Sequence, residues 1–438
     1  MSVNIEVDKY VAKRSIDHCA AFGAFRAFYG MNDAIVFFNS PFGCAFQIAL
    51  TFTRHARRWP SILSSLVMQP DLIFGTEEKV KEGLRVCYNS VKPSVIGLIA
   101  CCVSDTTGAD LARVASEVQQ ETPAKIIAVE GTAGYRGDHV DGYNQAILRI
   151  LDELVKESKE KIPKSVNLLG LVSDERMTIG DVIEVKRLLN KLGVTVICPL
   201  THYTNVNEIA SSSKAELNIV LNEEYGLKAA EFMQKRFGIP YIATSPPAGL
   251  DGTSEWIRKV AEHFRLLDKA EEIIREETIE TYQRVYIGSL YAAGRNVAIV
   301  ADPSTAVALT QLTAELGMIP KIIALKSNGT LSQDHIKTLA KRYDFSPRIM
   351  VKPDYYDLEE AIKSSNIEVI FGSTYEHWLA RKLKITDFAV TYPISHSLPI
   401  FEAGIFGYKN LRYWAQRIGD VFAPEYLFAE TIDGRYHI

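Results

Sequence analysis

Val95-Ile96-Gly97-Leu98-Ile99-Ala100 is a continuous apolar run that leads directly into Cys101 and Cys102. Apolar and polar residues do not alternate within it, which is typical of a strand buried on both faces of a parallel sheet. Similar short runs recur along the chain at residues 34–38, 125–129, 166–169, 195–197, 217–220, 296–300, 321–324, 348–351, 369–371 and 388–390. The sequence therefore predicts a fold built on parallel sheets.

Amphipathic stretches separate these runs, and the clearest of them span residues 105–121, 142–160, 179–192 and 227–237. Repeated alternation of strand and helix predicts a doubly wound α/β architecture. A chain of 438 residues exceeds the size of a single core. Charged stretches at 157–164 and 266–286 mark two boundaries. We predict three Rossmann-like domains, each a mainly parallel sheet flanked by helices, over residues 1–160, 161–286 and 287–438.

The composition is that of an ordinary globular protein, with 47% hydrophobic and 23% charged residues. A formal net charge of −4 gives no bias toward polyanions, so we expect no nucleic-acid partner. The first ten residues show no secretory signal, and no apolar run reaches the roughly 18 residues of a membrane span. We expect a cytoplasmic protein without a membrane-spanning segment. Neither a dinucleotide-binding glycine motif nor a phosphate-binding loop is present in the sequence.

Three cysteines are the candidate site residues. Cys19 precedes a helix-like run, Cys44 closes a turn after the strand at 34–38, and Cys102 follows the strand at 95–100. Gaps of 25 and 58 residues, without Cys-x-x-Cys, differ from compact zinc modules. Soft thiolates suit iron–sulfur chemistry, although intracellular cysteines are more often buried small apolar residues. A usual cubane needs four thiolates, so three cysteines imply that another ligand or another chain completes the site.

Around these cysteines the chain resembles the nitrogenase component 1 family, and within it the β-type subunit. The matching segments run in order along nearly the whole chain: Cys19 with Gly23, Gly43-Cys44, Phe74-Gly75 with residues 78–82, Cys102 with Gly108 and Asp110, residues 130–143, 237–241 and 315–320, and Gly404 with Gly407-Tyr408. The two cysteine gaps fit the β-type pattern better than the α-type pattern.

The resemblance implies that Cys19, Cys44 and Cys102 hold an iron–sulfur cluster at a subunit interface, either a P-cluster-like 8Fe-7S centre or a 4Fe-4S centre. Cys101 stays open as the alternative to Cys102, because a one-residue slip of the strand would exchange them. The implied function is that of an electron-relay subunit in an ATP-dependent, nitrogenase-like reductase. The implied partners are an α-type subunit in an α2β2 assembly and an ATP-hydrolysing iron protein as electron donor.

Several positions depart from the family pattern. Asn222 stands where the α-type subunit has a cysteine that anchors the catalytic metallocofactor, and His396 does not align with that cofactor's histidine ligand. Gly134 stands where the nitrogenase β-subunit has a serine near its cluster. Asn222 and His396 imply that this chain does not bind the active-site cofactor. The segments beside the cluster cysteines, residues 39–43 and 100–103, differ from those of ordinary nitrogenase β-subunits, which favours a nitrogenase-like reductase, with methylthio-alkane reductase first and a tetrapyrrole-reducing relative second. Two alternatives remain: a scaffold subunit for assembly of a nitrogenase-type cofactor, and a metal-free binding protein.

Overall fold

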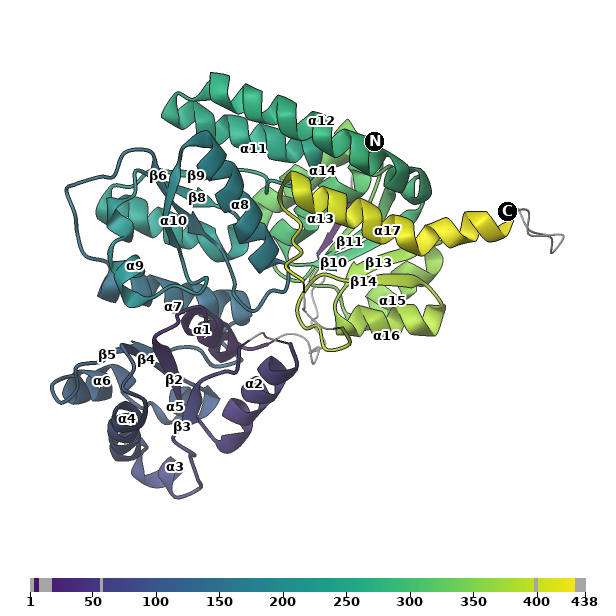
Figure 1. Ribbon diagram of the computed structural model, residues 1–438. Helices are drawn as coiled ribbons and strands as arrows, with labels where there is room; N and C mark the ends of the chain where they lie inside the picture. The colour runs from purple at the N-terminus through teal and green to yellow at the C-terminus, as the bar shows by residue number, and fades with distance from the viewer. Residues whose placement is uncertain (1–3, 8–17, 56–57, 398–400, 430–438) are drawn as a thin grey trace.

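The computed structural model describes residues 4–7, 18–55, 58–397 and 401–429 (Figure 1). In these residues three parallel sheets are flanked by helices, as the pattern of apolar runs predicts. The sheet nearest the N-terminus has the strand order β3 (Ile62–Ser64), β2 (Ala34–Asn39), β4 (Val95–Ala100) and β5 (Lys125–Val129). All six residues of β4 are buried, which agrees with its continuous apolar sequence.

The middle sheet has the order β7 (Thr195–Pro199), β6 (Ser165–Leu169), β8 (Leu217–Val220) and β9 (Tyr241–Ala243). The third sheet has the order β1 (Asn4–Val7), β12 (Arg348–Val351), β11 (Ile319–Leu325), β10 (Asn296–Ala301), β13 (Val369–Gly372) and β14 (Thr386–Ala389). Strand β1 pairs in parallel with β12, so the start of the chain joins the sheet of the C-terminal third. The three domains predicted from the sequence assign residues 1–160 to a single domain and therefore do not include this pairing.

The helices follow the strands in turn. Those around the first sheet are α1 (Ala20–Tyr29), α2 (Phe42–His55), α3 (Asp71–Phe74), α4 (Glu77–Val91), α5 (Cys102–Thr107), α6 (Leu111–Gln119) and α7 (His139–Leu154). After the first strand of the middle sheet the chain forms α8 (Thr178–Leu192), α9 (Val206–Ala210), α10 (Glu223–Phe237), α11 (Gly249–Phe264) and α12 (Leu267–Ala292), of which α8, α9 and α10 pack on its strands. The third sheet carries α13 (Pro303–Glu315), α14 (Thr330–Arg342), α15 (Tyr355–Ser364), α16 (Thr374–Leu383) and α17 (Gly407–Ala429).

The prediction of one helix over residues 105–121 was wrong, because two helices occupy this stretch. Gly108 ends α5 with φ of +69°, a left-handed conformation that glycine adopts without strain. The side chain of Asp110 then caps α6 by accepting a hydrogen bond from the backbone N–H of Arg113 at 2.9 Å. This break separates the short helix α5, which carries Cys102, from the helix that packs on the first sheet.

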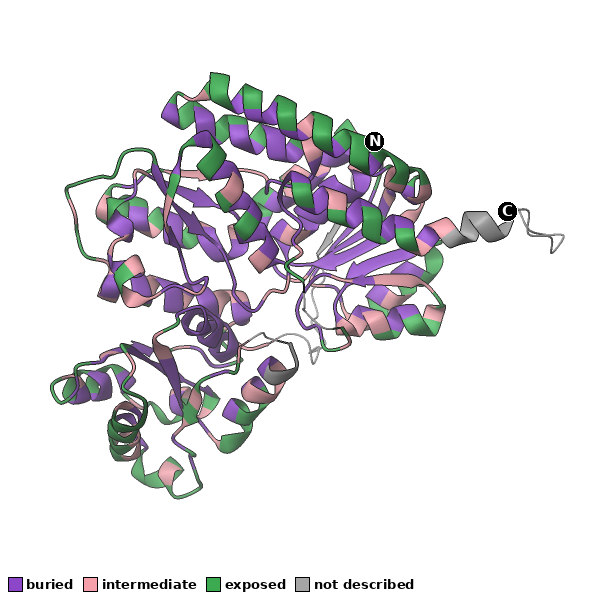
Figure 2. Cartoon of the chain, in the orientation of Figure 1, coloured by how far each residue is buried: buried purple, intermediate pink, exposed green. Residues whose placement is uncertain are grey.

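Helix α1 is buried along its whole length (Figure 2). Its neighbour α7 lies so close that a Cβ at Gly23 would meet the carbonyl oxygen of His139 at 1.8 Å. A Cβ at Gly142 would likewise meet the carbonyl oxygen of Ala20 at 1.7 Å. The two glycines therefore allow the backbones of α1 and α7 to touch, and this contact fixes the head of α1 where Cys19 lies.

Helices α12 and α17 lie side by side, and the largest apolar core lies beneath them between the middle and third sheets (Figure 1). A second core connects α1, α7 and α10 across the first and middle sheets. In the described part of the chain, no helix is both long enough and apolar enough to cross a membrane.

Candidate functional site

The structure brings the three predicted cysteines to the N-terminal ends of three helices. Cys19 is the N-cap residue of α1, Cys44 lies in the first turn of α2, and Cys102 is the first residue of α5. Strands β2 and β4 pair in parallel with Asn39 opposite Ala100, so α2 and α5 begin at the same edge of the sheet. Helix N-termini carry partial positive charge, which favours the thiolate form that binds metals.

A loop after β5 connects Cys19 with Cys102. The backbone N–H of Gly134 donates to the Cys102 sulfur at 3.3 Å. A Cβ built on Gly134 would lie 3.1 Å from the Cβ of Cys19 and 3.9 Å from the Cys102 sulfur. Gly134 thus lies between the two cysteines and presents only backbone atoms to them.

Polar contacts hold this loop against the ends of the strands. Arg136 forms an ion pair with Asp105 of α5, and Asp105 also accepts from the backbone N–H of Gly131 at 3.3 Å. The hydroxyl of Thr132 donates to the carbonyl oxygen of Ala100, at the end of β4. These bonds fix the position from which Gly134 reaches Cys102.

Cys101 and Cys102 have different environments. The Cys101 thiol is buried and makes a hydrogen bond with Cys44, which lowers the pKa of Cys44 to about 7. The same bond, together with burial and the nearby sulfur atoms of Cys19 and Cys102, raises the pKa of Cys101. Cys102 is exposed, whereas Cys19 is half-buried with a pKa raised chiefly by desolvation. Cys101 therefore acts as a donor toward Cys44.

The sulfur atoms are too widely spaced for a single tetrahedral ion. Bonds of about 2.3 Å from zinc to sulfur would place two thiolates about 3.8 Å apart. Among the described residues, the group of three ligand-type side chains with donor atoms within 4.8 Å of one another contains no cysteine. The thiols nevertheless lie close enough to affect one another's pKa. This arrangement fits an iron–sulfur cluster better than a single ion.

Apolar side chains are exposed beside the thiols. On α2, Phe42 and Phe46 stack with ring centroids 5.2 Å apart and are 62% and 49% exposed. On α3, Ile73 and Phe74 are 79% and 86% exposed. Large apolar side chains exposed beside a candidate site, as Phe42 and Phe46 are beside Cys44 on α2, mark a surface that a partner covers. A centre bound by the exposed Cys44 and Cys102 would need such a cover.

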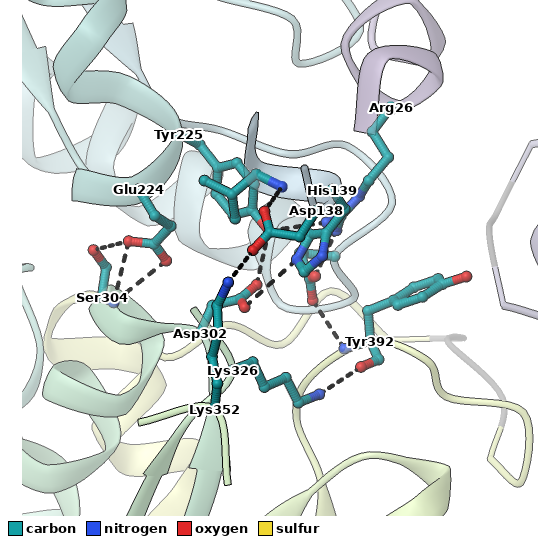
Figure 3. A network of polar contacts seen from close by, with 12 residues as sticks. Arg26, Asp138, His139, Glu224, Tyr225, Asp302, Ser304, Lys326, Lys352 and Tyr392 are labelled. Carbon is teal, nitrogen blue, oxygen red and sulfur yellow. Dashed lines mark hydrogen bonds and ion pairs between the residues drawn. The ribbon is translucent and has the colours of Figure 1, made fainter. Parts of the chain in front are cut away.

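A buried ionic network, which no local sequence pattern predicts, joins the three sheets (Figure 3). Arg26 of α1 donates through Nε to Asp174 at 2.9 and 3.0 Å, through Nη1 to Tyr225 at 3.0 Å, and through Nη2 to Glu175 at 2.6 Å. The guanidinium is almost completely buried, so these four bonds compensate the loss of its hydration.

The network continues into the third sheet. Tyr225 donates to Asp302 at 2.9 Å, and Asp302 lies 3.8 Å from His139 of α7. Lys326 donates to the carbonyl oxygen of Tyr392 at 2.7 Å (Figure 3). Glu224 also belongs to this network, and its burial, together with the nearby charge of Asp302, raises the pKa of Glu224 to about 8. Charged side chains thus occupy the junction between the sheets.

Two further positions singled out by sequence lie at the middle and third sheets. Asn222 follows β8 and donates from its side chain to the carbonyl oxygen of Gly170 at 2.7 Å. His396 lies beyond β14, with Nδ1 3.0 Å from the hydroxyl oxygen of Thr374. Among the described side chains that could share a metal ion, His396 is not grouped with any of the three cysteines. His396 does have ligand-type neighbours, His377 and Asp387, which form no recognisable sequence motif because they are separated along the chain.

Comparison with known proteins gives one consistent result. The family model of nitrogenase component 1 type oxidoreductases matches residues 19–422. A nitrogenase molybdenum-iron protein beta chain from Methanococcus maripaludis is 26% identical over 422 residues, covering 90% of each chain. A nitrogenase vanadium-iron protein beta chain from Trichormus variabilis is also 26% identical, covering 92% of each. A solved structure titled "Nitrogenase Cp1 at pH 6.5" superposes with a TM-score of 0.86 at 20% identity, covering 99% of this chain and 98% of the other.

Proposed function

The chain belongs to the nitrogenase component 1 type oxidoreductases, and on that premise we propose that it is a β-type subunit, like the relatives named beta chains, and the electron-relay subunit of a nitrogenase-like reductase. Cys19, Cys44 and Cys102 would hold an iron–sulfur cluster at the contact with an α-type partner. The observation that carries this proposal is the convergence of these thiols at three helix N-termini beside an exposed apolar surface.

The donor set fits such a cluster. Its members are thiolate-forming side chains, and their spacing exceeds that of a single-ion site. Cys102 is the better ligand of the adjacent pair, because Cys101 is buried, has a raised pKa and makes its hydrogen bond with Cys44. Three thiols from one chain leave part of a cluster without ligands, and the exposed apolar side chains indicate where the completing chain would lie.

When bound, the cluster would supply one-electron storage near the partner subunit. The chain's own residues position and tune this site. The backbone N–H of Gly134 donates to the Cys102 sulfur, and the Cys101 thiol hydrogen-bonds Cys44 and lowers its pKa. The backbone contact between α1 and α7 fixes Cys19.

The proposed assembly is α2β2, with an ATP-hydrolysing iron protein as the electron donor. The substrate site is assigned to the α-type partner, because the junction between the three sheets of this chain is filled by the network around Arg26. Relatives of equal identity have different metals in their names, so similarity alone does not select the metal or the substrate. We place the chain among reductases of the methylthio-alkane type, with the assembly scaffold as the rival function.

The ligand assignment is tested by measuring iron per chain and low-temperature EPR on protein purified without oxygen, together with its partner. Cys44→Ala is expected to lose most of the iron and the cluster signal while its circular dichroism spectrum stays unchanged. Cys87→Ala is the matched control, since Cys87 is a buried thiol on α4 in the same part of the fold. Unchanged iron in Cys44→Ala would contradict the assignment.

The reductase and the scaffold differ in what the loaded complex does. With the iron protein and ATP, a reductase is expected to turn over a small substrate while its metal content stays constant. A scaffold would instead transfer its metal centre to an acceptor protein. Loss of metal from the complex to such an acceptor, without reduction of substrate, would favour the scaffold.

A further inference from the structure

A second group of ligand-type side chains lies at the third sheet and contains none of the cysteines. His377 is on α16, Asp387 is on β14, and His396 is in the segment that follows that strand. One donor atom from each of the three lies within 4.8 Å of the other two. The topology creates this juxtaposition, because α16 leads into β14 and the following segment returns past the start of the same helix, where Thr374 contacts His396.

The distances within this group are close to those of a bound ion. His377 Nδ1 lies 3.0 and 3.1 Å from the two oxygen atoms of Asp387, and His396 Nε2 lies 3.7 Å from the nearer oxygen. Ligand bonds of about 2.1 Å at the tetrahedral angle would separate the donor atoms by about 3.4 Å. Adjustments of a few tenths of an ångström would bring the Asp387 carboxylate to this distance from both histidines. The two stacked rings would also rotate on binding, because the in-plane lone pairs of nearly parallel imidazoles do not converge on one ion.

The orientation of His396 is also that of a ligand. Its Nδ1 contacts the hydroxyl of Thr374 at 3.0 Å, while its Nε2 faces Asp387. Histidines that bind metals commonly use one ring nitrogen for the ion and place the other in a hydrogen bond that fixes the ring. The two imidazole rings stack with centroids 4.0 Å apart and planes 11° apart, so the single carboxylate reaches a nitrogen of each.

The group is accessible from solvent. The three side chains are 23%, 17% and 19% exposed and border a cavity of about 310 Å³. Arg176 and Arg417 also line this cavity, together with Phe388 and Trp414. One carboxylate does not neutralise a divalent ion, and the arginines add positive charge. A coordination position that opens on this cavity would therefore favour an anionic ligand.

From this geometry we propose that His377, Asp387 and His396 form a mononuclear site for a divalent transition-metal ion, with an open position facing the cavity. Two imidazoles and one carboxylate select ions such as Zn²⁺ or Fe²⁺ over Mg²⁺ and Ca²⁺, which prefer oxygen ligands. The site is separate from the cysteine centre and goes beyond the proposed electron relay. Failure of one proposal leaves the other unaffected.

The test is equilibrium dialysis of the purified full-length complex against micromolar Zn²⁺, after chelation, with zinc and iron counted per chain. Wild type is expected to retain one more zinc ion than Asp387→Asn or His396→Gln, with equal iron in all three. His263→Ala, a histidine on α11 outside the group, is the matched control and should retain the wild-type zinc count. Thr374→Val removes only the orienting hydroxyl and should weaken zinc affinity about 10- to 100-fold.

Thermal melts without metal identify variants that misfold. His396→Gln is the safer variant in this respect, because residue 396 lies outside the helices and strands. A wild-type zinc count that persists in both Asp387→Asn and His396→Gln would overturn the proposal. Zinc uptake that is matched by an equal loss of iron would mean that zinc replaces iron at the cysteines, and it would overturn the proposal as well.

Discussion

Gly134 donates its backbone N–H to the sulfur of Cys102 at 3.3 Å, and the place of its absent side chain lies between that sulfur and Cys19. The loop residue thus approaches both predicted ligands without adding a side chain. A hydroxyl introduced at this position would lie beside the iron–sulfur cluster that we propose these cysteines bind. The backbone hydrogen bond to Cys102 would remain, because any residue except proline keeps the N–H.

Gly134→Ser is expected to change the EPR spectrum and midpoint potential of the oxidised protein, because it brings an oxygen atom close to the Cys102 sulfur. Gly134→Ala is the control, since its methyl group meets the same 3.1 Å contact with Cys19 but adds no oxygen. Redox titration without oxygen, followed by EPR, measures both variants. Identical spectra for the serine and alanine variants would show that the hydroxyl does not reach the metal centre.

The hydrogen bond between Cys101 and Cys44 predicts unusual reactivity for Cys44 once iron is removed. This bond lowers the pKa of Cys44 to about 7, below the ordinary value of a thiol near 8.5. Alkylation of Cys44 by iodoacetamide is therefore expected to have its midpoint near pH 7. Cys101→Ala removes the donor and should move the midpoint upward by about one pH unit or more. Peptide mass spectrometry measures the rate, and Cys87→Ala should leave it unchanged.

The fold could be predicted from the sequence because buried parallel strands leave a local signal. Each of the eleven predicted apolar runs contains or overlaps a strand of the structure. The strands that were missed, β1, β3 and β9, are three or four residues long, and β3 and β9 contain no buried residue. Their positions depend on distant partners, as the pairing of β1 with β12 shows.

The candidate site was predictable only in part, for the same reason. Cys44 and Cys102 follow adjacent strands, so the local pattern already indicates that they meet at one edge of a sheet. The network around Arg26 leaves no such signal, because Arg26 and Asp174 are 148 residues apart and meet only through the packing of α1. The group of His377, Asp387 and His396 likewise depends on tertiary contacts.

Removing the cation of the buried network should destabilise the protein strongly. Arg26→Met leaves Asp174, whose side chain is fully buried, without its charged partner, at an expected cost of about 3–5 kcal/mol. Arg258→Met is the control, because the exposed pair of Arg258 and Glu271 should contribute less than about 1 kcal/mol. Differential scanning fluorimetry compares their melting temperatures. Equal shifts for the two variants would show that leaving Asp174 without its cation costs no more than breaking an exposed pair.

Asp181 predicts a specific dependence of stability on pH. Its carboxylate lies on α8 and accepts from the backbone N–H groups of Ile405 at 2.5 Å and Phe406 at 2.7 Å. Burial nevertheless raises the pKa of Asp181 to about 7. The pKa in the folded state exceeds the unfolded value of 3.8, so Asp181 contributes to folding stability through its protonated form. This contribution is fully present below about pH 4 and is lost as the pH rises to about 7.

Asp181→Asn removes this titration while the side-chain oxygen that accepts from the backbone remains. The melting temperature of the variant, relative to wild type, should therefore be higher at pH 8 than at pH 5, with a change in stability of up to about 1.4 kcal/mol per pKa unit. Asp334→Asn, an exposed carboxyl with a pKa lowered by Lys337, is the control and should not show this increase. Melting curves recorded at half-unit steps from pH 4 to 8 measure the difference. Parallel curves for wild type and Asp181→Asn would contradict the raised pKa, because the titrating carboxyl is the change that separates the two proteins.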